Sequence, residues 1–257
     1  MREVVRKHGE LTVHILPTRE EMGIASGKRI EEVIKNAIKK NGEARVIFAS
    51  APSQNEMLNY LKSTDINWSK VVGFHMDEYV GIDKQAPQSF TKFLDDRLVK
   101  EVGMGKWYPF GGTTDSVDND LKEYEKLLTE KPIDLVVLGI GENGHLAFND
   151  PDFCDFNDPL VVKVVELDQV CRNQQVNDGC FKTLDEVPTH ALTITMPPLL
   201  TCDKMIAVVP GPTKKNAIKR TTLGEITEQC PASILRNYSN AELYVDFAAY
   251  SLVEELK

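Results

Sequence analysis

Two segments of the sequence carry side chains that could take up and release protons. The first is FHMDEY at 74–79, where His75, Asp77 and Glu78 lie at the end of an apolar run over 71–76. Because side chains alternate across a strand, His75 and Asp77 could share one face. A carboxylate at a strand end is well placed to act as a general base, whereas Asp77 or Glu78 could instead cap the following turn.

The second segment is GIGENGHLAFNDP at 139–151, a glycine-rich stretch after an apolar strand pattern. Its glycines allow the backbone to approach a ligand closely. His145 can both accept and donate a proton near neutral pH, and Asp150 could orient its ring. The alternative is a buried, hydrogen-bonded histidine with no catalytic part. The glycine spacing does not match a dinucleotide-binding fingerprint, so no such cofactor is expected.

Two further turns offer groups that could bind a phosphate. ASAPSQN at 49–55 joins an expected strand to an expected helix, and a helix N-terminus presents free N–H groups to an anion. The backbone N–H groups of Ser53 and Gln54 would be the donors, although Ser53 could equally act as a helix cap. VPGPTKK at 209–215 repeats the strand-to-helix change and offers Lys214 as a cation, or simply as a surface lysine.

Length and composition are those of a globular protein. The 257 residues are 42% apolar and 27% charged, with a net charge of −9, which argues against a nucleic-acid binder and against adhesion to anionic membranes. No apolar run reaches the roughly 18 residues of a membrane span, and residues 1–8 lack the apolar stretch of a signal peptide, so a cytoplasmic protein is expected. The five cysteines form no C-x-x-C pair, and neither a disulfide framework nor a metal site is expected.

Apolar runs of strand length alternate with helical patterns along the chain. The run at 133–140 (IDLVVLGI) is almost entirely apolar, which is typical of a strand covered on both faces. This alternation predicts an α/β protein, an open three-layer sandwich with a mostly parallel sheet, formed by one domain over 1–257. A ligand in such a sheet lies beyond the carboxyl ends of the strands, so the segments after Ala49, Met76 and Ile140 should form the site.

The elements themselves follow from pattern and capping signals. TREE at 18–21 and SQNE at 53–56 both have the form of a capping box, so a helix should follow each. Further helices are expected at 90–99, 118–130, 214–219 and 232–236. Strands are expected at 11–16, 44–49, 71–76, 133–140, 161–167, 191–194, 205–209 and 242–247.

At these residues the sequence resembles the glucosamine-6-phosphate deaminase (isomerase) family, relatives of 6-phosphogluconolactonase. MDEYVG at 76–81, QSF at 88–90 and LGIGENGHLAFNDP at 138–151 carry the match, in the family's order and spacing. The lactonase branch typically has a DER-type segment and a GHTAS-like stretch instead. The resemblance implies a modified Rossmann-like sheet, no cofactor, and conversion of an aldose amino-sugar phosphate to a ketose phosphate with loss of ammonia.

The resemblance also implies roles for four residues. His145 matches the ring-opening residue, and Asp77 matches the base that moves a proton between C2 and C1. Asn143 and Asp150 match two positions that assist ring opening. The family usually has glutamate at the second of these, so Asp150 is one methylene shorter. An unperturbed aspartate is a poor base, and partial burial should raise the pKa of Asp77.

The phosphate-binding half departs from the family pattern. The family's loop reads like TGGTP or GSTP, where this chain has ASAPSQN, and the family's phosphate-binding arginine corresponds to Gln175. Arg172 lies three residues earlier and could replace that arginine if its loop is shifted. Lys214 does match the family's phosphate lysine. The residues expected to bind substrate or its phosphate are Ser53, Gln54, Gly144, Arg172 and Lys214.

The expected partner is a small sugar phosphate, without nucleic acid or membrane. Glucosamine 6-phosphate or an epimer would be converted to a ketose 6-phosphate and ammonia. A phosphosugar lactonase and a non-catalytic sugar-phosphate-binding protein are the alternatives, and the altered phosphate loop favours the second of these. The sequence leaves open the epimer, a homo-oligomer and any allosteric effector.

Overall fold

Eight strands form one large sheet in a computed structural model that describes residues 3–111, 116–177 and 179–254. Their order across the sheet is β1-β2-β11-β10-β7-β3-β4-β6, and every neighbouring pair is parallel except β1 and β2. The predicted mostly parallel sheet is therefore confirmed. The strands are β1 (Val4–His8), β2 (Leu11–Leu16), β3 (Ala44–Phe48), β4 (Val71–His75), β6 (Lys106–Tyr108), β7 (Ile133–Leu138), β10 (Cys202–Val209) and β11 (Ala241–Asp246).

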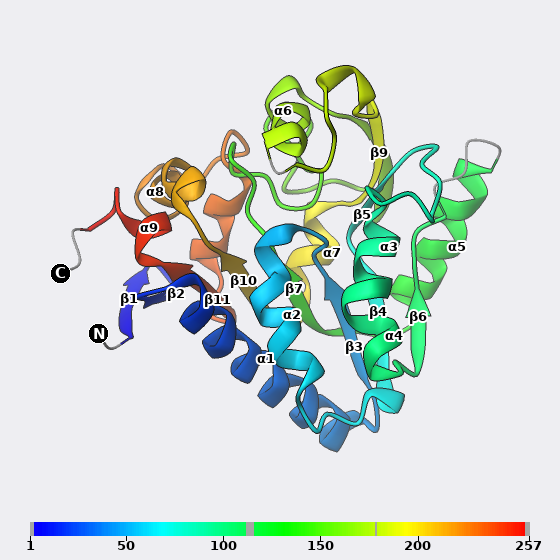
Figure 1. Cartoon of the computed structure of the whole chain (residues 1–257), viewed down its shortest axis with the longest axis horizontal. Helices are drawn as coiled ribbons and strands as arrows, with labels where there is room; N and C mark the ends of the chain where they lie inside the picture. Colours follow the sequence, from blue (N-terminus) through cyan, green and yellow to red (C-terminus); the bar gives the residue numbers. More distant parts are fainter. Residues whose placement is uncertain (1–2, 112–115, 178, 255–257) are drawn as a thin grey trace.

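Helices cover both faces of this sheet, as Figure 1 shows, and the predicted three-layer sandwich is confirmed. Along β7, Leu135 and Val137 pack with the helices of one face, and Val136 and Leu138 pack in the core of the other. One face carries α1 (Arg19–Asn41), α2 (Asn55–Lys62) and α3 (Phe90–Leu94); the other carries α5 (Val117–Thr129), α7 (Met196–Leu200), α8 (Lys215–Leu223) and α9 (Phe247–Tyr250). No helix in the described ranges is long and apolar enough to cross a membrane.

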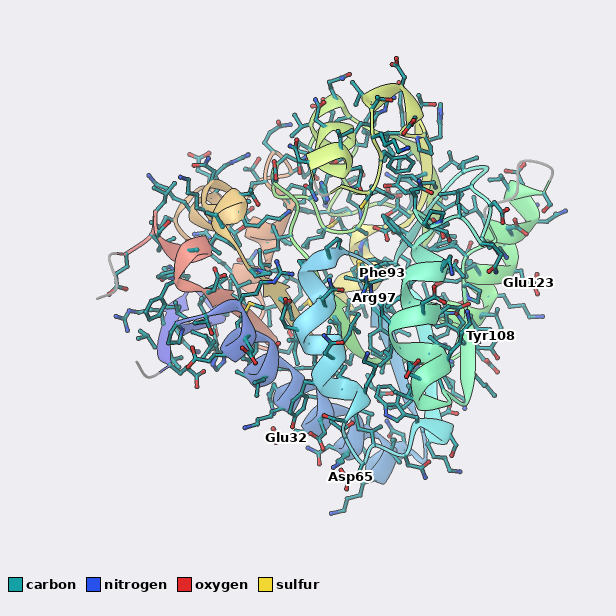
Figure 2. The ribbon with its side chains drawn as sticks, in the orientation of Figure 1. Glu32, Asp65, Phe93, Arg97, Tyr108 and Glu123 are labelled. Carbon is teal, nitrogen blue, oxygen red and sulfur yellow. The ribbon has the colours of Figure 1, made fainter. Side chains whose placement is uncertain are left out.

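The predicted helix at 90–99 forms and runs on to Val102. Its middle, Asp95–Val99, is a π-helical turn between α3 and α4 (Lys100–Val102). The Arg97 guanidinium lies over the Phe93 ring, 4.7 Å from its centroid (Figure 2). Asp65 and Glu123, both labelled in Figure 2, are two charged residues with exposed side chains.

The first of the two predicted capping boxes forms only in part, because the Glu21 carboxylate accepts the Thr18 hydroxyl and not a backbone N–H, and the second does not form. Thr18 Oγ1 accepts the backbone N–H of Glu21, and α1 begins as expected. Ser53 makes no cap, because Pro52–Gln54 forms a 3-10 turn before α2 begins at Asn55. The same arrangement recurs at Pro212–Lys214, the 3-10 turn before α8. The predicted helix at 232–236 is also a 3-10 helix, over Pro231–Asn237.

A second, three-stranded antiparallel sheet was not predicted. Its order is β5-β9-β8, with β5 (Asp77–Tyr79), β9 (His190–Ile194) and β8 (Val162–Glu166). The predicted strands at 161–167 and 191–194 thus form, but in a sheet of their own. The apolar run at 71–76 continues into β5, and the chain passes from the large sheet to the small one at Met76.

Glu78 joins the small sheet to the start of α3. Its buried carboxylate accepts the Ser89 hydroxyl at 2.8 Å and the backbone N–H groups of Thr91 at 2.9 Å and Phe90 at 3.2 Å. It also accepts the N–H of Tyr79 at 3.0 Å. An anion at a helix N-terminus satisfies donors that the helix itself cannot pair. Glu78 therefore caps the next helix, which leaves Asp77 as the carboxylate available for chemistry.

Glu78→Ala should lower the free energy of unfolding by roughly 3 kcal/mol or more, because several buried donors would lose their acceptor. Denaturant unfolding of the variant measures this loss. Glu123→Ala, at an exposed position of α5, is the control and should stay within about 0.5 kcal/mol of the wild type. Equal stability of the two variants would contradict the capping role.

Candidate active site

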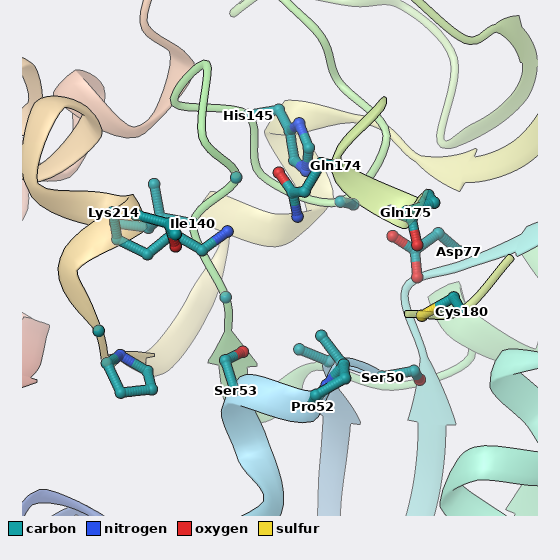
Figure 3. A pocket seen from close by; sticks show the side chains of 18 of the residues that line it. Ser50, Pro52, Ser53, Asp77, Ile140, His145, Gln174, Gln175, Cys180 and Lys214 are labelled. Atoms are coloured by element: carbon teal, nitrogen blue, oxygen red, sulfur yellow. The ribbon is translucent and has the colours of Figure 1, made fainter. Parts of the chain in front are cut away.

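A cavity of about 300 Å³ lies at the carboxyl edge of the large sheet. Its volume is at the lower end of the roughly 300–1,000 Å³ usual for small-molecule pockets. The three segments expected from the sequence, after Ala49, Met76 and Ile140, all line it. Figure 3 shows Lys214 and Ser53 on one side of the cavity and Asp77 on the other, with His145 between them along the rim.

Asp77 reaches the cavity as the first residue of β5. It is buried, and its Oδ1 has no hydrogen-bond partner among the described residues. Burial raises the pKa of the carboxyl well above its usual range, and the charges of Glu78 and Asp150 add to the effect. The raised pKa expected from the sequence is thus confirmed in direction. Such a carboxylate is a stronger base than an exposed aspartate.

His145 lines the cavity, and Asp150 contacts its ring on the side away from the cavity. The Nδ1 atom of the ring lies 2.8 Å from Asp150 Oδ1, and Asp150 itself is fully buried. Burial opposes ionisation of Asp150, but the adjacent His145 ring and the Asn143 amide outweigh it, and the pKa of Asp150 is lowered. Because Nδ1 faces Asp150, Nε2 is the ring nitrogen that is left to contact a ligand. A side chain at Gly141 would overlap the imidazole, so glycine is required there.

Asn143 organises this pair without lining the cavity. Its Nδ2 donates to Asp150 at 2.9 Å and to Asp168 at 3.0 Å, and its Oδ1 accepts the backbone N–H of His145. The shorter side chain at position 150 therefore still reaches His145. Asn143 and Asp150 thus contact the His145 backbone and ring, and their part in ring opening stays a prediction.

His75 does not share the site with Asp77. Its buried ring accepts the Phe110 N–H at 2.8 Å and packs beside Trp107. Burial lowers the pKa of His75 to about 3, with a small contribution from Lys84, so the ring is neutral. The prediction that His75 and Asp77 share a strand face is wrong, because β4 ends at His75 and the chain enters the other sheet before Asp77.

The expected phosphate-binding residues divide into two groups. Ser53 and Lys214 line the cavity as predicted. Gln54 does not: its backbone N–H donates to Ala51 O, and its buried side chain donates to Ser53 Oγ and to Val208 O. Gln54 thus supports Ser53 from below and has no N–H left for an anion.

Gly144 and Arg172 are also corrected. Gly144 has φ +94° and is not among the lining residues; a side chain there would meet Cys230, so glycine is needed for the turn. Arg172 lies outside the cavity, because its Nη2 donates to the carbonyls of Leu184 at 2.8 Å and Val187 at 3.0 Å. The guanidinium ties its own helix to the loop that follows.

Sequence reasoning missed the helix that places two amides at the cavity. This helix, α6 (Gln169–Asn177), is too polar for an apolar pattern to reveal it. Gln174 and Gln175 on α6 line the cavity, and Gln174 Oε1 also accepts the Glu142 N–H. A signal was present in Asp168, which accepts the N–H three residues later as a helix cap does.

Arg19 is a further lining residue that sequence reasoning missed. It is the first residue of α1, shortly after β2 ends at Leu16. Its position beyond a strand's carboxyl end was the signal, since that is the edge where ligands lie.

Three potential metal ligands lie together beneath the cavity. Donor atoms of His145, Asp150 and Cys171 are within 4.8 Å of one another. Burial, followed by the charge of Asp150, raises the pKa of the Cys171 thiol well above its usual range. A metal would need the thiolate, which this environment disfavours.

A buried carboxylate and a histidine in contact with a second carboxylate thus line one cavity at the edge of a three-layer α/β fold. Residues 17–245 match the family model described as glucosamine-6-phosphate isomerases/6-phosphogluconolactonase, and the chain belongs to this family.

Known relatives span both branches. The chain is 31% identical over 245 residues to a glucosamine-6-phosphate deaminase of Bacillus cereus (strain B4264), covering 95% of this chain and 90% of the relative. A solved monomeric glucosamine-6-phosphate deaminase superposes with a TM-score of 0.85 at 25% identity, over 93% of this chain and 99% of the other. The 6-phosphogluconolactonase of Trypanosoma brucei shares the fold, with a TM-score of 0.77 at 15% identity, over 98% of this chain and 100% of the other.

Asp77→Asn should stabilise the protein at neutral pH. The folded state raises the pKa of Asp77, so the wild type loses stability as pH rises from about 4 through the folded-state pKa, by about 1.4 kcal/mol for each unit of the shift. Asparagine carries no charge and avoids that loss. The melting temperature of the variant should exceed that of the wild type at pH 7 and approach it near pH 4. An equal difference at both pH values would contradict the raised pKa of Asp77 in the folded state.

Proposed function

We propose that this chain isomerises and deaminates an amino-sugar 6-phosphate, glucosamine 6-phosphate or an epimer, to a ketose 6-phosphate and ammonia. The observation that carries the proposal is one cavity lined by two groups. One is the buried carboxylate of Asp77, whose Oδ1 has no hydrogen-bond partner among the described residues, and the other is His145, whose Nδ1 lies 2.8 Å from a buried carboxylate. The relatives named glucosamine-6-phosphate deaminase support it.

His145 opens the pyranose ring in this scheme. It first accepts the proton of the C1 hydroxyl and then donates a proton to the ring oxygen, which breaks the bond between C1 and that oxygen and yields the open-chain aldehyde. Asp150 stabilises the imidazolium form between these two transfers, and Asn143 fixes the loop that carries the ring. Asp77 then removes the proton from C2 while the C1 carbonyl oxygen takes up a proton, which gives an enolamine. Asp77 returns its proton at C1, and the nitrogen gives up one proton. The resulting C2 imine adds water and releases ammonia, which leaves the ketose.

The phosphate lies at the opposite end of the cavity in this scheme, beside Ser53 and Lys214. A dianion in a partly dry pocket is costly unless cations and hydrogen-bond donors accompany it. Lys214 is buried, with 7% of its surface exposed, and it supplies one positive charge from the turn after β10. The substrate thus spans the cavity, with C1 and C2 beside Asp77.

Asp77→Asn should lower ammonia release from glucosamine 6-phosphate by roughly 10²-fold or more, because a general base contributes about that factor. Its Michaelis constant and its folded state should change little, since asparagine is nearly isosteric. Retention of more than about a tenth of the wild-type rate would remove Asp77 as the base.

His145→Gln should slow a cyclic substrate far more than an open-chain analogue, because a substrate without a ring bypasses the ring-opening step. Steady-state rates of the variant on the two compounds, each divided by the wild-type rate, measure the difference. The same fractional loss on both would show that His145 acts after ring opening or on the fold alone.

A further inference from the structure

The cavity has a shortage of positive charge on the side where the family places an arginine. The corresponding residue, Gln175, lines the cavity with a neutral amide, and Arg172 is bound elsewhere. Among the described residues that line the cavity, Lys214 and Arg19 are the lysine and arginine side chains. A phosphate dianion would have one charge unmatched if Lys214 acted alone.

We infer that Arg19, at the start of α1, is the second phosphate-binding cation of this site and sets its preference for a phosphorylated sugar. This inference rests on the proposed function, since it names a group that would hold that substrate. The arginine would act from the α1 side of the cavity, where the family acts from the α6 side.

Contacts at the start of α1 place Arg19 beside the phosphate end. Its Nη2 donates to the Pro52 carbonyl at 2.6 Å, and Pro52 directly precedes the lining residue Ser53. Its Nε lies 2.7 Å from Glu56 Oε1 on α2. The hydrogen bond to Pro52 anchors the guanidinium, Nε makes an ion-pair contact with Glu56 without a hydrogen bond, and Nη1 makes no hydrogen bond to the described part of the chain. A planar guanidinium held in this way can donate to a phosphate at little further entropic cost.

The packing of α1 against α2 makes this placement possible. A side chain at Gly23 would overlap Glu56, and one at Gly27 would overlap Tyr60, so the two helices approach closely. This approach brings the first turn of α1 next to the 3-10 turn at Pro52–Gln54. Arg19 therefore reaches the same cavity edge as Ser53, although the two belong to segments far apart in the sequence.

A purely structural role for Arg19, tying α1 to the Pro52 turn, predicts a different pattern of effects. Loss of a tie would displace the turn for every ligand alike. Loss of a phosphate contact would weaken only ligands that carry a phosphate. The two roles are separated by comparing phosphorylated with unphosphorylated compounds.

The test uses Arg19→Met, Arg19→Lys and the control Arg29→Met, which removes an arginine on the same helix that pairs with Glu242 and Glu32 outside the cavity. Ammonia release is measured with glucosamine 6-phosphate and with glucosamine, and binding of inorganic phosphate by calorimetry. Arg19→Met should raise the Michaelis constant for glucosamine 6-phosphate about tenfold or more, with a much smaller fall in kcat. Phosphate binding should weaken by a similar factor, Arg19→Lys should recover part of the loss, and Arg29→Met should match the wild type.

Equal losses on both sugars, or unchanged phosphate binding in Arg19→Met, would overturn the inference. If the wild type binds phosphate and releases ammonia, and Arg19→Met does both equally well, this inference alone is overturned. A wild type that neither binds phosphate nor releases ammonia would overturn the proposed function, and this inference with it.

Discussion

The burial of one carboxylate, Asp77, at the junction of two sheets is the constraint on which the site depends. Its ionised form is disfavoured there by desolvation and by the charges of two neighbouring acids. The neighbouring Glu78 offsets this cost, because its carboxylate accepts several hydrogen bonds at the start of α3. These bonds fix β5, the strand that carries Asp77. The same burial that disfavours the ionised carboxylate makes Asp77 a stronger base, as proton abstraction from carbon would require.

Both sheets contribute residues to the cavity. The large sheet delivers its loops to one edge, where the turns after β3, β7 and β10 supply Ser53, the glycine-rich segment and Lys214. The small sheet supplies Asp77 through β5 and lies against the aromatic cluster that includes Phe90 and Phe148, both of which line the cavity. The position of Asp77 relative to His145 therefore depends on the turn at Met76 rather than on either sheet alone.

Most strands and the cavity edge could be predicted, because apolar runs in a parallel sheet are nearly continuous and their carboxyl ends share one edge. The passage from β4 into β5 could not be, since the apolar run continues to Met76 and hides the change of sheet. Arg172 and Gln54 were misplaced for another reason: residue type indicates what a side chain can bind, but tertiary contacts decide what it does bind. Whether Asp77 and His145 act as assigned stays a prediction.

Deamination of an amino-sugar phosphate, as proposed for this cavity, differs from lactone hydrolysis and from binding alone in the products that are released. The most direct measurement is product formation by the wild-type protein on a panel of amino-sugar 6-phosphates, followed as ammonia and ketose phosphate, beside hydrolysis of 6-phosphogluconolactone. We expect equal amounts of ammonia and ketose phosphate from at least one amino sugar and no lactone hydrolysis above the spontaneous rate. Lactone hydrolysis without ammonia release, or tight binding of the amino-sugar phosphates with no product, would contradict this expectation.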